Sequence, residues 1–278
     1  MTMPAVLQSP GAAKLTPTRA SVALGSRIWA RLSTPLLSLA ILGVAVGGWQ
    51  LGVELGASPL ILPPPVEVLE AFWSGLFSAE GTFLRHMQVT LLESLIGFVL
   101  GLVGGVVVGA LLSYSPRLDR ASYPYIMAFQ TFPKIAIAPL LVTWLGFGIA
   151  SKAVIAAILA FFPILVNIKA GLGNVDSDML QLMRSMRATQ FQQLRWLRVP
   201  NALAYLFPAL DTAIVLSLLG AVAGELVGAK SGLGYLLLTK TFTADIAAVY
   251  AVMLLLGIIG ISLHLLAVTV KRKLLFWQ

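Results

Sequence analysis

Long apolar runs alternate with short polar segments along most of the chain. A helix needs about 20 mainly apolar residues to cross the roughly 30 Å hydrocarbon core of a bilayer. Several runs approach or exceed that length, so the pattern predicts an all-α, polytopic membrane protein with about six transmembrane helices. The expected spans cover residues 35–53, 89–112, 123–145, 153–168, 204–226 and 246–270.

Polar ends flank the expected transmembrane domain, residues 34–273. Residues 1–33 are rich in Ser, Thr, Ala and Pro and carry four basic residues. They lack the compact apolar core of a cleavable signal peptide, and we interpret them as a mobile cytosolic tail. Residues 271–278 form a short C-terminal end that opens with Lys-Arg-Lys. Between the first two spans, three prolines at 63–65 predict an extended stretch, followed by a short surface helix.

Composition and charge support the membrane interpretation. The chain is 58% hydrophobic and 11% charged, whereas about a quarter of the residues of a soluble domain are charged. Of its 19 Lys and Arg residues, fourteen fall on the side of the two termini, four on the other, and Lys134 within a span. This asymmetry places both termini in the cytosol. It also explains the net charge of +8 without a nucleic-acid partner. The absence of cysteine excludes disulfides.

Two series of glycines at a spacing of four residues stand within expected spans. That spacing places them on one stripe of a helix, where a second backbone can approach closely. We therefore predict that they pack helices together, although glycine is also common in membrane helices generally. The residues are Gly97, Gly101, Gly105 and Gly109 in the second span, and Gly220 and Gly224 in the fifth.

The third expected span combines prolines with a charge. Pro133 and Pro139 free backbone carbonyls that lipid cannot satisfy, and Lys134 between them would be costly against lipid. One interpretation places Lys134 beside a water-filled translocation path, with the two prolines. The other starts the helix later, so that Lys134 extends to the interface.

Several apparent chemical motifs do not form a site. Residues 224–231 approach a phosphate-binding loop, but Ala229 replaces the second glycine and the segment follows a membrane helix rather than a strand. We therefore expect no nucleotide to bind here. No nucleophile is grouped with a base, and no metal-ligand spacing occurs. The isolated candidates are His86 and His264, expected to lie apart, and Glu93, Asp211 and Glu225, interpreted as hydrated span-end acids.

A polar, basic segment at 176–200 separates two of the most apolar runs. Asp176 or Ser177 can cap a helix whose first turn holds Asp178. A second helical piece follows and ends at Pro200. This shape suits the docking of a soluble partner, but an amphipathic helix lying on lipid headgroups would have the same pattern.

The segment resembles the cytoplasmic EAA loop of the membrane subunit of bacterial binding-protein-dependent ABC importers. That pattern reads roughly E-A-A-x-x-x-G-A, followed after several residues by a hydrophobic residue and proline. The matching positions, which the resemblance implies couple to an ATPase, are Gln181, Leu182, Met183, Arg184, Ser185, Arg187 and Ala188. Residues 133–148, 160–167 and 224–237 resemble the nitrate/sulfonate/taurine branch of these permeases.

The segment also departs from the family pattern. Gln181 replaces the glutamate, Leu182 and Met183 replace the alanines, and Arg187 replaces the central glycine. We interpret Arg187 as a sign that the helix continues where the family turns. Coupling would then be weaker or tuned to a particular ATPase, or the chain would pair with a different permease.

The resemblance implies the type I ABC importer permease fold in the bacterial inner membrane. It also implies cytosolic ATPase subunits that bind ATP and Mg²⁺, a second identical or related permease chain, an external solute-binding protein and surrounding lipid. The chain itself would hold no cofactor or metal and catalyse no reaction. Lys134 would suit an anionic solute such as a sulfonate. The alternative is an autonomous secondary transporter or channel, for which paired intramembrane acids or broken helices are expected and are not evident in the sequence.

Overall fold

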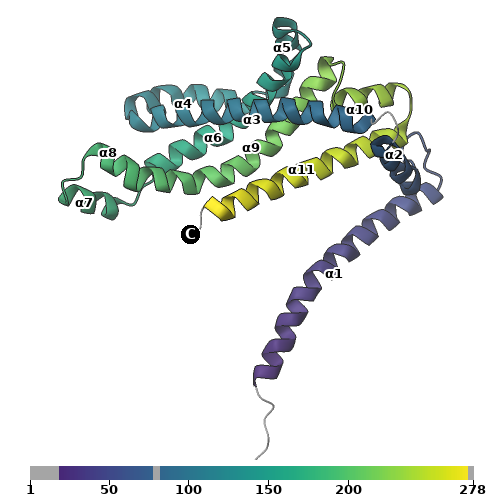
Figure 1. The fold of residues 1–278 in the computed structure, drawn as a ribbon, viewed down its shortest axis with the longest axis horizontal. Helices are drawn as coiled ribbons and strands as arrows, with labels where there is room; N and C mark the ends of the chain where they lie inside the picture. The colour runs from purple at the N-terminus through teal and green to yellow at the C-terminus, as the bar shows by residue number, and fades with distance from the viewer. Residues whose placement is uncertain (1–18, 78–81, 275–278) are drawn as a thin grey trace, which may run out of the picture. The chain divides into compact units, whose positions relative to one another are not determined.

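The structure is a computed structural model that describes residues 19–77 and 82–274 (Figure 1). It divides into two compact units, residues 1–57 and 58–278, which we describe separately. Every regular element in the described part is helical. In chain order these are α1 (Arg19–Glu54), α2 (Pro65–Phe77), α3 (Thr82–Tyr114), α4 (Pro116–Thr131), η1 (Lys134–Ile137), α5 (Ala138–Leu145), α6 (Ile149–Gly173), α7 (Ser177–Ser185), α8 (Gln190–Gln193), η2 (Leu194–Arg198), α9 (Val199–Gly228), α10 (Leu233–Phe242) and α11 (Ile246–Leu274).

In the first unit, the described residues form one long helix, α1, followed by a turn. Its segment Leu36–Glu54 is apolar enough to cross a membrane. The helix already begins at Arg19, so the boundary between a tail and a span that we expected near residue 33 is not observed. Residues 19–33 are therefore helical, while their mobility and their cytosolic side stay predictions, and residues 1–18 lie outside the described residues.

The core of the second unit is formed by α3, α6 and α9, with α6 packed against both of the others. Ala160, Ile164 and Ile168 of α6 are buried together with Ala202 and Ala213 of α9. Proline occurs inside α6 and α9, at Pro163 and Pro208. Pro163 is half-buried beside the pocket described below, a setting in which membrane helices tolerate proline, whereas Pro208 is exposed.

The third expected span is not one helix. It consists of α4 and the segment Lys134–Leu145, bent by 84° relative to each other. Phe132 ends α4 in an extended conformation (φ −68°, ψ 135°) because Pro133 follows it. Proline disfavours a helical residue before it and cannot donate the next helical hydrogen bond. The expectation of a continuous span over 123–145 is therefore corrected to a broken one.

The remaining expected spans correspond to α3, α6, α9 and α11. Within residues 19–77 and 82–274, five helices are long and apolar enough to span a membrane, or six if the bent pair counts as one span. The fifth span is longer than expected, because α8, η2 and α9 run on from Gln190 to Gly228. The wide turn η2 precedes Pro200, which has no N–H to donate to the carbonyl of Trp196.

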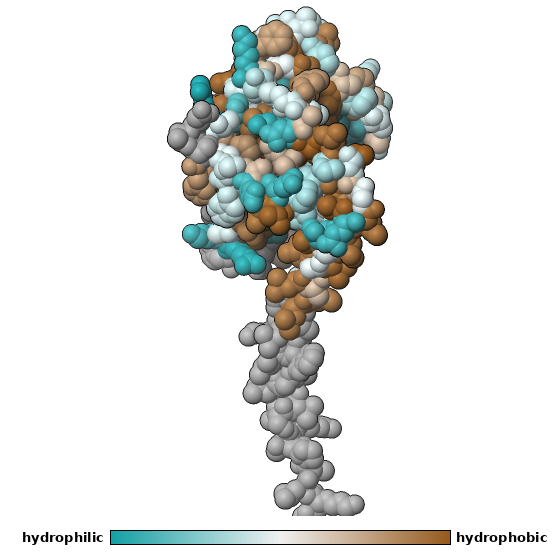
Figure 2. All heavy atoms as spheres, turned by 90° about the vertical axis from the view of Figure 1, so that its right-hand side faces the viewer, coloured by the Kyte–Doolittle hydropathy of each residue, from teal (hydrophilic) through white to brown (hydrophobic). Residues whose placement is uncertain are grey.

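Short helices cover the end of the second unit opposite α7 and α8 (Figure 1). There α2 packs against α11, and the Tyr250 hydroxyl donates to the carbonyl of Ile61 (3.1 Å). Lys240 at the end of α10 pairs with Asp245 (2.8 Å), which in turn accepts the amide of Ala248 and caps α11. Figure 2 looks onto this end, where polar side chains are interspersed with apolar ones. Following the charge asymmetry, we take it as the external end.

Candidate functional site

The glycines of α3 lie along the face that packs on α6. A Cβ added at Gly101 would lie 2.8 Å from the carbonyl oxygen of Ala157 and 2.9 Å from the Cβ of Ala160. Gly97, Gly105 and Gly109 are equally close to α6. Gly220 and Gly224 of α9 approach α6 from another side, next to Ala156 and Ile155. These contacts hold α6 between two helices at close backbone distance.

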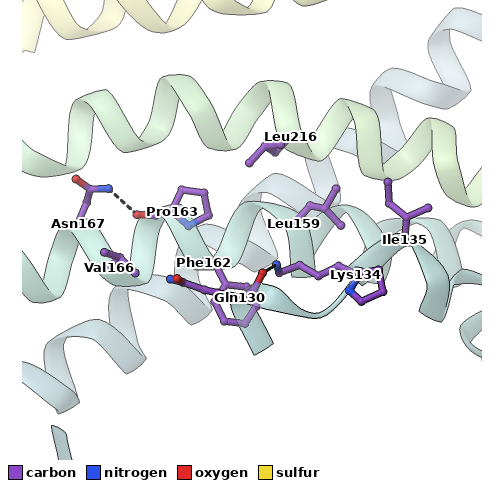
Figure 3. Close-up of a pocket in the computed structure, with 10 residues that line it drawn as sticks. Gln130, Lys134, Ile135, Leu159, Phe162, Pro163, Val166, Asn167 and Leu216 are labelled. Atoms are coloured by element: carbon purple, nitrogen blue, oxygen red, sulfur yellow. Dashed lines mark hydrogen bonds between the residues drawn. The ribbon is translucent and has the colours of Figure 1, made fainter. Parts of the chain in front are cut away.

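A pocket of about 600 Å³ opens beside the broken span (Figure 3). Its polar groups are the ammonium of Lys134 and the side-chain amides of Gln130 and Asn167. The ring of Phe162 and the aliphatic side chains of the pocket complete its walls. The lining residues are Gln130, Pro133, Lys134, Ile135, Leu159, Phe162, Pro163, Val166, Asn167 and Leu216, which come from the bend after α4, from α6 and from α9.

Lys134 stands at the break between α4 and α5. Its Nζ donates to the carbonyl of Gln130 (2.9 Å) and lies 5.0 Å from the centre of the Phe162 ring. The same lysine lines a second, mostly aromatic pocket of about 380 Å³ with Phe129, Phe132 and Phe161. The sequence left two interpretations of Lys134 open. The geometry fits the one that places its ammonium beside a cavity. Pro133 lines the first pocket, whereas Pro139 is among the lining residues of neither.

Pro163 adds a backbone acceptor to the pocket. Since proline has no N–H, the carbonyl of Leu159 one turn earlier loses its helical partner, and both residues line the cavity. Asn167 donates to the carbonyl of Pro163 (2.9 Å), as the dashed line in Figure 3 shows. The pocket thus offers one cation, two amides and an aromatic face to a small solute.

The segment 176–200 lies at the opposite end of the second unit from α10 (Figure 1). Asp176 caps α7 by accepting the amide of Asp178 (2.8 Å), and Thr189 with Gln192 forms a capping box at α8. Gln181, Arg184 and Ser185 are exposed, while Met183 and Ala188 are half-buried. Large apolar side chains also face outward here, namely Met179, Leu182, Met186, Phe191 and Trp196.

The expectation that α7 continues through Arg187 is wrong. The helix ends at Ser185, and Arg187 takes a left-handed conformation with φ of 56°. The amides of Met186 and Ala188 donate to the carbonyls of Leu182 and Met183 (3.0 and 2.9 Å), which closes the helix end. Glycine usually occupies this position because it has no Cβ. The family's turn is therefore kept, with an arginine where glycine is expected.

Two side chains that the sequence did not single out, Arg198 at the end of this segment and Asn201 just after it in α9, bond to the end of α6. The amide of Asn201 donates to the carbonyls of Gly171 (2.7 Å) and Asn174 (3.0 Å). Arg198 donates to the carbonyl of Leu172 (3.4 Å). These are the last carbonyls of α6, which have no helical partner of their own. Displacement of the segment would therefore act on α6 as well as α9.

The interpretation of Glu93 and Glu225 as hydrated span-end acids is wrong. They are 3% and 1% exposed, and Lys152 beside them is 1% exposed. His86 belongs to the same cluster through its bond with the amide of Gly232. Asp211 instead pairs with His264 across α9 and α11 (2.5 Å), and both remain partly exposed. Within residues 19–77 and 82–274, no group of three or more His, Cys, Asp or Glu is placed to hold a metal.

The fold and these sites define a helical protein with five or six candidate membrane spans in its described residues, a pocket beside a broken span and a polar segment at one end. A family model described as "Binding-protein-dependent transport system inner membrane component" matches residues 97–275. The chain belongs to this family. It is therefore a multi-pass inner-membrane permease subunit of an ATP-driven solute importer.

Named relatives and a solved structure agree with this assignment. The formylaminopyrimidine transport permease ThiX of Halalkalibacterium halodurans is 33% identical over 83% of this chain and 91% of its own length. The putative aliphatic sulfonates permease SsuC of Bacillus subtilis is 29% identical over 84% and 85%. A chain of the MetNI methionine ABC transporter, in an inward-facing conformation, superposes with a TM-score of 0.61 at 21% identity, covering 69% of this chain and 95% of that one. At this identity it supports the fold alone.

Proposed function

We propose that this permease carries a small anionic organic solute past Lys134 and is driven by separate ATPase chains bound to the segment 176–200. The observation that carries the proposal is the position of Lys134, at the break of a span and on the wall of a 600 Å³ cavity. A cation held there beside two amides favours a solute with an anionic group.

The surface of segment 176–200 supports an ATPase partner. Several of its large apolar side chains, among them Leu182, Met186 and Phe191, are exposed in the described part of the chain. Arg184 and Arg187 lie in the same segment and would suit an acidic edge on the partner. The Asn201 and Arg198 bonds to α6 provide the mechanical connection to the helices that line the pocket.

The proposed assembly has two permease chains, identical or related, two cytosolic ATPases that bind ATP and Mg²⁺, and an external solute-binding protein. Closure of the ATPases would draw the two 176–200 segments together and open the spans outward. Hydrolysis would restore the inward-facing state. This is alternating access around a site near the midplane. The permease chain itself hydrolyses no nucleotide.

The solute class rests on the pocket. The sulfonate permease named above is consistent with an anionic solute, whereas the formylaminopyrimidine permease shows that relatives of similar identity are named for a heterocycle. The Phe162 ring would accommodate either an alkyl chain or a ring beside the anionic group.

The competing function is an autonomous secondary transporter or channel. The structure contains the two features that this alternative predicts, a broken span and a pair of intramembrane acids. However, the acids lie at the external end of the core rather than among the pocket residues. Family membership favours the importer.

Vesicles that contain the permease with its ATPase and binding protein would separate the two functions. We expect uptake of butanesulfonate to stop when ATP is withheld and to continue in the presence of an uncoupler. Uptake by the permease alone, driven by an ion gradient and abolished by the uncoupler, would contradict the importer mechanism.

A further inference from the structure

Three ionisable side chains are buried together at the external end of the helix core, away from the pocket. Glu93 comes from α3, Glu225 from α9 and Lys152 from α6. Their exposed fractions are 3%, 1% and 1%. Burial of isolated charges is costly, so the protonation of this cluster must balance its charges.

Glu225 is surrounded by hydrogen-bond donors. Its Oε1 accepts the Thr90 hydroxyl (2.8 Å), and its Oε2 accepts the amide of Gly234 (2.5 Å). A carboxyl group that accepts donors at both oxygens is stabilised in its ionised form. Glu225 is therefore the carboxylate of the cluster.

Glu93 has the opposite surroundings. It follows Thr90, whose hydroxyl donates to Glu225, by one turn of α3, and its Oε2 has no hydrogen-bond partner among the described residues. A buried carboxylate oxygen without a donor is costly, so Glu93 rather than Glu225 is the acid suited to the neutral form. We propose that Glu93 and Glu225 form a buried proton-binding site, with the proton on Glu93.

Lys152 completes the charge balance. Its Nζ donates to the carbonyls of Phe147 (2.5 Å) and Gly148 (3.2 Å), as an ammonium can. One ammonium, one carboxylate and one neutral acid sum to zero. Two carboxylates would leave a net negative charge in a site closed to water. A metal cation is not needed, since Lys152 already supplies the positive charge.

The proton site fastens two external segments to the core. The amides of Gly232, Leu233 and Gly234, at the start of α10, donate to His86 Nδ1 (2.9 Å), Thr90 Oγ1 (2.8 Å) and Glu225 Oε2. The backbone amides at the N-terminus of α10, which have no acceptor within their own helix, thus donate to side chains of α3 and α9. Lys152 holds the turn between α5 and α6. With a proton on Glu93, the cluster holds both the start of α10 and the α5–α6 turn without a net buried charge.

The other ionisable groups near the cluster fit this assignment. His86 accepts at Nδ1, so its single ring proton lies on Nε2 and the imidazole is neutral. The ring of Tyr235 on α10 lies near the ring of His86, and Arg85 is the neighbouring charge on α3.

Neutral isosteres of the two acids should therefore behave differently. The test measures apparent melting temperatures of the full-length chain in detergent at one scan rate. Glu93→Gln keeps a neutral donor and should change the melting temperature by less than about 3 °C. Glu225→Gln and Lys152→Met each leave one charge unpaired and should lower it by roughly 10 °C. The double variant Lys152→Met with Glu225→Gln should recover much of that loss.

Infrared spectroscopy of the same samples at neutral pH reports the proton directly. The wild-type chain should show the carbonyl stretch of a buried, protonated carboxylic acid, and Glu93→Gln should lose it. Equal destabilisation by Glu93→Gln and Glu225→Gln, or an acid band that survives Glu93→Gln, would overturn the assignment. If a variant fails to insert, the infrared comparison of wild type at neutral and alkaline pH still decides, because an acid band absent at neutral pH refutes the site.

Discussion

The amide of Ala188 donates to the carbonyl of Met183 across 2.9 Å and closes α7 with Arg187 in a left-handed conformation. For a residue with a Cβ this conformation costs about 1–2 kcal/mol relative to the ordinary helical region. The arginine therefore occupies a strained position in the segment that we propose binds the ATPase. Its backbone and its charge can be tested separately.

We expect Arg187→Gly to stabilise the chain by about 1 kcal/mol, because glycine removes the strain at this φ. Arg187→Glu keeps the strain and reverses the charge. In reconstituted vesicles it should allow ATP hydrolysis but lower the solute transported per ATP, while Arg187→Gly changes this ratio less. Normal transport by Arg187→Glu would contradict the coupling role and favour the alternative interpretation of the segment as a helix lying on lipid headgroups.

Asn201 should be required to transmit movement from the segment 176–200 to α6. Asn201→Ala removes both donors to the carbonyls of Gly171 and Asn174, at a cost of about 1–2 kcal/mol. Uptake should fall more than ATP hydrolysis in the same preparation. Ser262→Ala is the control, because the Ser262 hydroxyl bonds to the carbonyl of Ile258 within α11, away from the segment. Equal effects of the two variants would argue against this connection.

The α3–α6 seam offers a matched pair of glycines. Gly101→Ala places its Cβ 2.8 Å from the carbonyl oxygen of Ala157, whereas Gly104→Ala meets only the edge of Phe161 at 3.4 Å. We expect Gly101→Ala to destabilise by about 1–3 kcal/mol and Gly104→Ala by less than 1. The melting temperature in detergent measures both. Similar values would show that the seam relaxes around an added methyl group.

Lys134 should set the preference for anionic solutes. Lys134→Met removes the charge from the pocket and should reduce uptake of butanesulfonate more than that of the neutral butanesulfonamide. Lys134→Arg keeps the charge and should retain the preference. Unchanged uptake and solute range in Lys134→Met would remove the proposed role.

Asp245 should contribute a pH-dependent part of stability. Partial burial alone would raise the pKa of Asp245, but hydrogen bonds from Lys240 and the Ala248 amide, with the Lys240 charge, lower it. The stabilisation is therefore present above the unfolded-state pKa, near 4, and lost as pH falls through the lower folded value. Asp245→Asn should flatten this acid limb of the melting-temperature profile relative to wild type. An identical profile in the variant would exclude Asp245 as its source.

Local sequence determined the helical class, most of the spans and the polar segment at 176–200. These features follow from the length of apolar runs and from charges that must stay in water, so neighbouring helices are not needed to predict them. Asp176 and Thr189 each cap the helix that follows them in the sequence, so such caps can also be predicted without knowledge of neighbouring helices.

Tertiary structure decided the features that depend on which helices meet. Glu93 and Glu225 are 132 positions apart and look like separate span-end acids. Only the packing of α3 and α9 in the helix core buries both, so the local sequence could not pair them. The break at Pro133 could have been inferred from proline chemistry alone. The cavity beside Lys134 could not, because α6 and α9 supply its other walls.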